Sequence, residues 1–133
     1  MSYPLIVAAL KAALEAVSGV KYTLDYEPKA IHDAPMLYLL LDGVERDDQG
    51  NAGVKTIYDI AATLVIRWQD NEQAERQLIA MLDGIMGALD TDPTLGGMNG
   101  WAGIVSAEAG YMDVSGTKYR IVVFGITAEE RVC

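Results

Sequence analysis

Side chains that could carry out catalysis are few in this sequence and lie far apart. The chain has one histidine, His32, and one cysteine, Cys133, which is the last residue. A nucleophile activated by a histidine would depend on His32, and no Gly-x-Ser-x-Gly sequence is present. An enzyme is therefore the least favoured function, and replacing His32 by alanine is expected to have no effect.

The acidic residues are also poorly arranged for binding a metal ion. Asp47 and Asp48 are adjacent, as are Glu129 and Glu130, and adjacent residues on a strand point to opposite faces. The glycine-rich segment 95–100 lacks the Gly-Lys-Ser/Thr ending of a phosphate-binding loop. We expect solvated charge at these positions, with no catalytic residue, no metal site and no cofactor.

The length and net charge of the chain limit its domain organisation and the kinds of partner that it can bind. The 133 residues suffice for a single domain, 1–133, with a hydrophobic core. The formal net charge of −9 argues against wrapping nucleic acid or binding an anionic membrane, although DNA could pass close by without being held. No segment reads as a signal peptide or membrane span, and a lone cysteine cannot form a disulfide within the chain. We expect the protein to be made and kept in a reducing cytoplasm.

The longest pattern in the sequence is the alternation of apolar and polar side chains from Val54 to Gln69. A period of two predicts a β-strand. At about 3.3 Å per residue this strand would span roughly 50 Å, whereas a domain of this size is about 30 Å across. Part of the strand is therefore expected to project as a ribbon that binds another chain. The apolar face comprises Val54, Thr56, Tyr58, Ile60, Ala62, Leu64, Ile66 and Trp68.

The segment from Asp42 to Gly53 joins this strand to an apolar run at Met36–Leu41. It is rich in glycine and charge and can bury little, so we predict a mobile loop at the tip of the ribbon. Lys55 and Asp59 are expected to protect an exposed strand edge from aggregation. The candidate interface residues on the loop and the long strand are Glu45, Arg46, Asp47, Asp48, Lys55, Asp59, Arg67 and Trp68.

Two helices are predicted from hydrophobic spacing. The first is capped by Ser2 and is ended by Gly19, in the left-handed conformation that favours glycine. The second is capped by Asp70 and presents Leu78, Leu82, Ile85 and Leu89 on one face. Gly84 and Gly87 in this helix are expected to allow close packing against the sheet.

The remaining segments are predicted as strands and connections. Strands are expected at Val20–Tyr26, Met36–Leu41, Trp101–Met112 and Thr117–Thr127, with a turn at 113–116 and a tail at 128–133. The order of elements predicts an α+β fold. It is a two-layer sandwich of a mostly antiparallel sheet with two helices packed on one face and a long projecting β-hairpin.

Four aromatic side chains near predicted strand ends, Trp68, Trp101, Tyr111 and Tyr119, suit either a core or an interface. A small-molecule binding module is a further possibility, in which Trp68 and Trp101 line a pocket between helices and sheet. Thermal-shift screening of ligands would reveal such a module through stabilisation.

Several segments share the layout of a known family. They are the opening helix around 8–15, Ala34-Pro35 followed by an apolar strand and an acidic glycine loop to Glu45, and the long strand ending near Ile66-Arg67-Trp68. The helix after Asp70 and the closing pair of strands follow in the same order. From Tyr3 to Val132 the chain resembles the tail terminator (tail completion) proteins of long-tailed phages, of the lambda type.

The resemblance implies a structural, non-enzymatic virion protein that sits as a hexameric ring on the head-proximal end of a finished tail tube. Such a ring stops polymerisation of the major tail tube protein and presents a surface to the head-tail connector protein. DNA passes through its centre without specific binding. The subunit is expected to be monomeric or weakly associated before it meets the tail. The alternative is a head-side neck protein, a stopper or adaptor of the head-tail connector.

Overall fold

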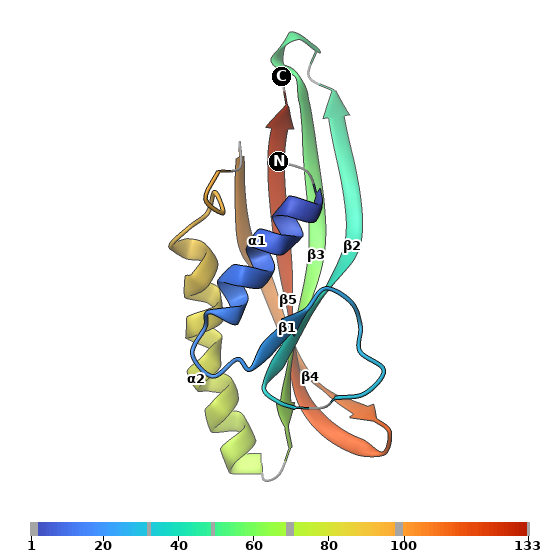
Figure 1. The fold of residues 1–133 in the computed structure, drawn as a ribbon, viewed down its shortest axis with the longest axis vertical. Coiled ribbons are helices and arrows are strands. Elements are labelled where there is room, and N and C mark those ends of the chain that lie inside the picture. Colours follow the sequence, from blue (N-terminus) through green and yellow to red (C-terminus); the bar gives the residue numbers. More distant parts are fainter. Residues whose placement is uncertain (1–2, 32, 49, 69–70, 98–99, 133) are drawn as a thin grey trace.

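The computed structural model describes residues 3–31, 33–48, 50–68, 71–97 and 100–132. Two helices and five strands follow one another along the chain (Figure 1). They are α1 (Tyr3–Glu15), β1 (Tyr22–Leu24), β2 (Met36–Asp48), β3 (Val54–Arg67), α2 (Asn71–Asp90), β4 (Gly100–Val114) and β5 (Thr117–Val132), with a 3-10 turn at Gly50–Ala52.

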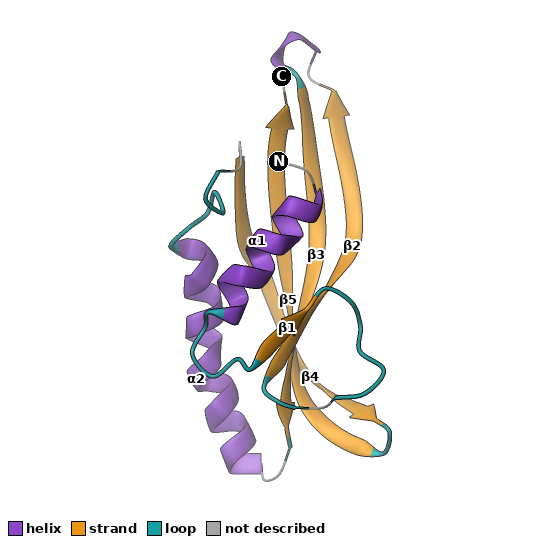
Figure 2. Ribbon diagram, in the orientation of Figure 1, coloured by secondary structure: helices purple, strands orange, loops and turns teal. Residues whose placement is uncertain are grey.

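The strands form one sheet in the order β1-β2-β3-β5-β4. All neighbouring pairs are antiparallel except β1 and β2, which are parallel. Both helices pack on the same face of this sheet (Figure 2). The predicted α+β sandwich is confirmed, and β1 is a shortened form of the strand expected at Val20–Tyr26.

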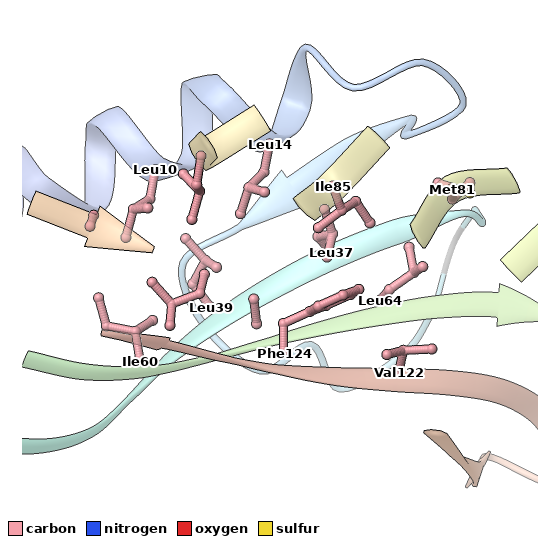
Figure 3. Packing of buried hydrophobic residues seen from close by; sticks show 14 of the residues in the cluster. Leu10, Leu14, Leu37, Leu39, Ile60, Leu64, Met81, Ile85, Val122 and Phe124 are labelled. Atoms are coloured by element: carbon pink, nitrogen blue, oxygen red, sulfur yellow. The ribbon is translucent and has the colours of Figure 1, made fainter. Parts of the chain in front are cut away.

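The main core lies between the helices and the sheet and follows the alternation of β3. Ile60, Ala62, Leu64 and Ile66 are at most 1% exposed and belong to the cluster that contains buried residues of both helices. Full burial of a leucine or phenylalanine side chain contributes about 1.5–3 kcal/mol, so this layer holds the helices on the sheet. Figure 3 shows its central side chains, which include Leu10, Leu14, Leu37, Leu39, Ile60, Leu64, Met81, Ile85, Val122 and Phe124.

A second, smaller cluster covers part of the opposite face. Met36, Tyr38, Val65 and Tyr119 are buried there. Because Leu37 and Leu39 face the helices, the start of β2 is covered on both sides, as predicted for this apolar run. The cover ends before Leu41, whose side chain is 48% exposed.

Two segments predicted as a loop and a tail are strands instead. Residues 43–48 continue β2 past a bulge at Asp42 and pair with Val54–Asp59, so the connection at the tip shrinks to 49–53. Likewise β5 runs to Val132 and pairs with β3 as far as Val54. Both segments were predicted to lack strands because their residues are mostly polar. Their strand structure comes from hydrogen bonding to neighbours distant in sequence, which composition cannot reveal.

The helix ends also differ from expectation. Helix α1 ends at Glu15, and Gly19, with φ +96°, lies in a separate turn closed by the Val20 N–H donating to the Val17 carbonyl at 3.2 Å. A Cβ at Gly84 would lie 3.1 Å from Val17 Cγ1, so this glycine allows approach of the segment after α1 rather than of the sheet. The predicted caps Ser2 and Asp70 lie outside the described residues.

The turn between β4 and β5 is shorter than the predicted 113–116 connection. Only Ser115 and Gly116 lie between the strands, and their φ angles are +52° and +82°. Two positive φ angles are the pattern of a tight turn that matches the twist of its strands, which favours a glycine such as Gly116. The turn closes a hairpin that carries Tyr119 into the second cluster.

Candidate assembly surface

Strands β2, β3 and β5 continue together past the first turn of α1 (Figure 1). We call this part, Asp42–Asp48 with Val54–Asp59 and Thr127–Val132, the ribbon. The projecting β2–β3 hairpin is confirmed, and β5 adds a third strand that was not predicted: Val54 pairs with Asp48 on one side and with Val132 on the other. Hydrogen bonding along both sides of β3 makes the ribbon a continuation of the sheet.

The base of the ribbon is attached to α1 through two tyrosines. The ring centroids of Tyr3 and Tyr58 lie 5.1 Å apart, a distance at which aromatic rings attract each other. Burial raises the pKa of Tyr3, with smaller contributions from the charges of Asp25 and Tyr58. The helix and the ribbon are therefore joined where the sheet leaves the body.

The ribbon is strongly acidic. Its three segments contain seven carboxylates and three basic side chains, which gives a formal net charge of −4. The candidate residues Glu45, Arg46, Asp47 and Asp48 are all exposed on β2. At the tip, Asp48 Oδ1 accepts a hydrogen bond of 2.9 Å from the Gly50 N–H, which fixes the start of the turn.

Lys55 and Asp59 lie inside the sheet and do not line an edge. Lys55 Nζ is 2.8 Å from Glu129 Oε1 on β5, and the two side chains are 26% and 24% exposed. Asp59 is half-buried and is paired with Gly43 on one side and Thr127 on the other. The expectation that these charges protect an exposed edge is therefore wrong, because β3 has a strand on each side.

The sheet ends in β1 on one side and in β4 on the other, and beyond the short β1 the edge is formed by β2. Strand β1 pairs only with Met36–Tyr38, so within the described part of the chain the outer side of β2 is uncovered from Leu41 to Asp48. On β4, the Ala102 N–H donates to the Pro93 carbonyl at 2.6 Å, which covers the first residues of that edge. Further along β4, five consecutive residues from Val105 to Ala109 are exposed.

The remaining candidates, Arg67 and Trp68, lie at the opposite end of β3. Arg67 pairs with Tyr119, whereas Lys55 pairs with Arg131 at the other end of β5. Twelve residues of strand separate Lys55 from Arg67, or roughly 40 Å at about 3.3 Å per residue. The structure therefore brings six of the eight candidate residues together on the ribbon and leaves two apart from them.

Trp68 belongs to a group of cations and aromatic rings that the sequence did not indicate. Lys118 Nζ lies 4.5 Å from the Trp68 ring centroid and 4.6 Å from that of Tyr111, and Arg120 Cζ lies 4.6 Å from the Tyr111 ring. Arg120 Nε donates to Glu75 Oε1 at 2.7 Å, which ties β5 to α2. These cation–π contacts, favourable by about 0.5–1 kcal/mol at exposed sites, order this end of the sheet.

A polar depression of about 520 Å³ lies near Arg67 and is also lined by Lys21, Asp33 and Arg76. Lys21 Nζ donates to Asp33 Oδ1 at 2.8 Å. This hydrogen bond, more than the nearby charge of Arg67, holds the pKa of Asp33 below its ordinary value of 3.8. Sequence reasoning missed the depression because strand pairing brings together residues that are far apart along the chain.

The four singled-out aromatics play different roles. Tyr119 is 6% exposed and belongs to the second cluster, whereas Tyr111 and Trp101 are 53% and 40% exposed. Trp101 pairs with Glu129 in the ribbon, and Trp68 directly follows the far end of β3. The prediction that Trp68 and Trp101 line one pocket is therefore wrong.

Among the residues that the structure describes, no group of three or more His, Cys, Asp or Glu side chains could hold a metal ion. His32 and Cys133 lie outside that part of the chain. No helix within the described ranges is long and apolar enough to cross a membrane.

Comparison with known proteins identifies the fold. No protein-family model matches the chain, and no curated protein sequence matches it. The structure is similar to a chain in a solved structure described as the virion of a native gene transfer agent particle. The TM-score is 0.54 with 17% sequence identity, and the match covers 97% of this chain and 99% of that chain. The two chains share a fold along nearly their whole lengths.

Proposed function

We propose that this chain is a structural, non-enzymatic protein of a phage-like virion. It forms a homo-oligomeric ring, a hexamer, on the head-proximal end of the tail tube. The ring stops polymerisation of the major tail tube protein and offers its other side to the head-tail connector protein. The subunits are made in the host cytoplasm and remain in the virion.

The observation that carries this proposal is the fold shared with a chain of a gene transfer agent virion. A match over 97% of one chain and 99% of the other relates two whole folds rather than a local motif. The order of helices and strands is also the one that led from the sequence to the tail terminator family. The segment order and the shared fold both favour a virion component.

The ribbon supports an assembly role physically. Three strands project beyond the helices, and within the described residues the seven β2 residues of the ribbon, Asp42–Asp48, form an uncovered edge. An exposed sheet edge offers unpaired backbone groups to another chain. Such an edge can pair with a strand of a neighbouring subunit when both subunits bind the end of the tube.

Charge supports the passage of DNA through the ring. The chain carries a formal net charge of −9, and the ribbon contributes −4 of it. Carboxylates near a channel repel phosphates, so DNA can move past them without being retained. The same ribbon suits a tube end that carries basic side chains.

Electron microscopy of particles made without this protein tests the proposal. Loss of a tube cap should give overlong tails that carry no heads. Tails of normal length together with filled heads that leak DNA would contradict the proposal and indicate a head-side neck protein. A plasmid-borne copy of the wild-type chain serves as the control and should restore normal tails.

A further inference from the structure

Among the residues that the structure describes, two uncovered strand edges lie on opposite sides of the same sheet. One is Leu41–Asp48 on β2, and the other is Val105–Ala109 on β4. Both edges offer backbone groups that can pair with another strand. In an assembled particle, a strand of another chain could therefore cover each of them.

We propose that the β2 edge of one copy pairs with the β4 edge of the next copy, so that the sheets join around the ring. This inference rests on the proposed function and names the surface through which its subunits meet. The contact is heterologous, because each copy uses a different edge toward each of its two neighbours. Repeating it by rotation closes a ring in which both of these edges are paired.

The strand directions fit this pairing. β2 is antiparallel to β3, β3 to β5, and β5 to β4, so β2 and β4 run in opposite directions. The two edges are offset along the strands, since the register places Val44 level with Ala102 and Ala107 level with Leu39. Rotation about a ring axis inclined to the strands makes up this offset and keeps the strand directions. The neighbour's β4 therefore arrives antiparallel to β2, which is the more stable mode of pairing.

The side chains on both edges also suit burial. Leu41 and Val44 on β2 are each 48% exposed, and Val105 on β4 is 64% exposed. The rest of the β4 edge is Ser106, Ala107, Glu108 and Ala109, mostly small residues that let a second backbone approach. Pairing would remove these exposed apolar side chains from water.

Charge selects this pairing over a symmetric one. The β2 edge carries Asp42, Glu45, Asp47 and Asp48 against Arg46 alone, whereas the β4 edge carries only Glu108. Two β2 edges placed together would bring their carboxylates face to face, which is unfavourable. Two β4 edges placed together would leave both β2 edges uncovered.

Disulfide trapping between single-cysteine variants tests the proposal. In a Cys133→Ser background, cysteine is placed on β2 by Val44→Cys or Arg46→Cys, and on β4 by Ala107→Cys or Ala109→Cys. All four positions are on the helix-covered face, judged by their partners Tyr58, Thr56, Phe124 and Val122. Copies of different mass are mixed, with purified tail tubes and also as concentrated free protein, and then oxidised.

We expect a mixed β2–β4 disulfide at least about tenfold more abundant than β2–β2 or β4–β4 disulfides. Ile79→Cys, which is 62% exposed on α2 and on neither edge, is the control partner and should give only background. Capping of tubes without a β2–β4 disulfide overturns this inference and leaves the proposed function standing. A β2–β4 disulfide in free protein that never caps tubes supports the inference and overturns the proposed function. Absence of the mixed disulfide under both conditions overturns the inference.

Discussion

Lys55 and Glu129 join the central strand of the ribbon to β5: the Lys55 Nζ lies 2.8 Å from the Glu129 Oε1, and both side chains are about three-quarters buried. The pair lies within the acidic ribbon, where Lys55 is also the register partner of Asp47 on β2. It therefore stabilises the element on which the assembly proposal depends.

Replacing Lys55 by methionine should lower the free energy of unfolding by about 1 kcal/mol, because Glu129 then loses its partner in a partly buried position. Urea denaturation measures this change, and added salt should reduce it. The matched control is Arg76→Met, since its pair with Glu72 is 77% and 70% exposed and should contribute little. Equal effects of the two substitutions would show that the ribbon pair has no special role.

The main core should be sensitive to truncation at its centre. Phe124 is fully buried on β5 beneath both helices (Figure 3). Phe124→Ala removes its contacts and leaves a cavity, so we predict a loss of about 3–5 kcal/mol. The exposed Ile79→Ala change on α2 should stay within about 0.5 kcal/mol. A small effect of Phe124→Ala would mean that the helices do not pack on this face of the sheet.

The Lys21–Asp33 pair gives stability a defined dependence on pH. The pKa of Asp33 is lower in the folded chain than its ordinary value of 3.8, chiefly because Lys21 donates a hydrogen bond to it. Its contribution is therefore complete above pH 3.8 and is lost as the pH falls toward the folded-state pKa. Asp33→Asn should destabilise the protein slightly at pH 7 and have a vanishing effect in more acidic solution. Because the pair is exposed, the effect at pH 7 should be small. A destabilisation that grows on acidification would contradict this assignment.

Charge on the β4 edge should control subunit association. Ala107→Glu adds a carboxylate opposite the acidic β2 edge of the neighbouring copy and should weaken ring formation on tubes about tenfold at low salt. Ala107→Lys has a similar length and the opposite charge, so it should match or exceed the wild-type chain. Both changes are at an exposed position and should leave thermal stability unchanged. Equal association of the two variants would argue that β4 is not at the subunit contact.

The sequence predicted those parts of the fold in which local periodicity and burial agree. The alternation of β3 identified the core residues Ile60, Ala62, Leu64 and Ile66, because a period of two places these four on the helix-covered face. The segments 42–48 and 128–132 were missed because their side chains are polar and their strand structure depends on distant partners. Local composition contains no information about such partners.

Six of the eight candidate interface residues were correctly predicted to lie together. Glu45 to Asp48, Lys55 and Asp59 are together on the ribbon because one hairpin contains them all. Arg67 and Trp68 were grouped with them by their place on the same long strand, whose length separates them from the ribbon. The β4 edge was not recognised, since only the strand order shows that β4 ends the sheet.

The mass of the protein in solution, measured with and without purified tail tubes, tests the central claim most directly. We predict a free subunit or weak oligomer alone, and a ring of six copies bound at one end of each tube when tubes are present. A chain that leaves tube ends bare at every concentration, or coats the tubes along their length, would contradict the proposal that it caps them.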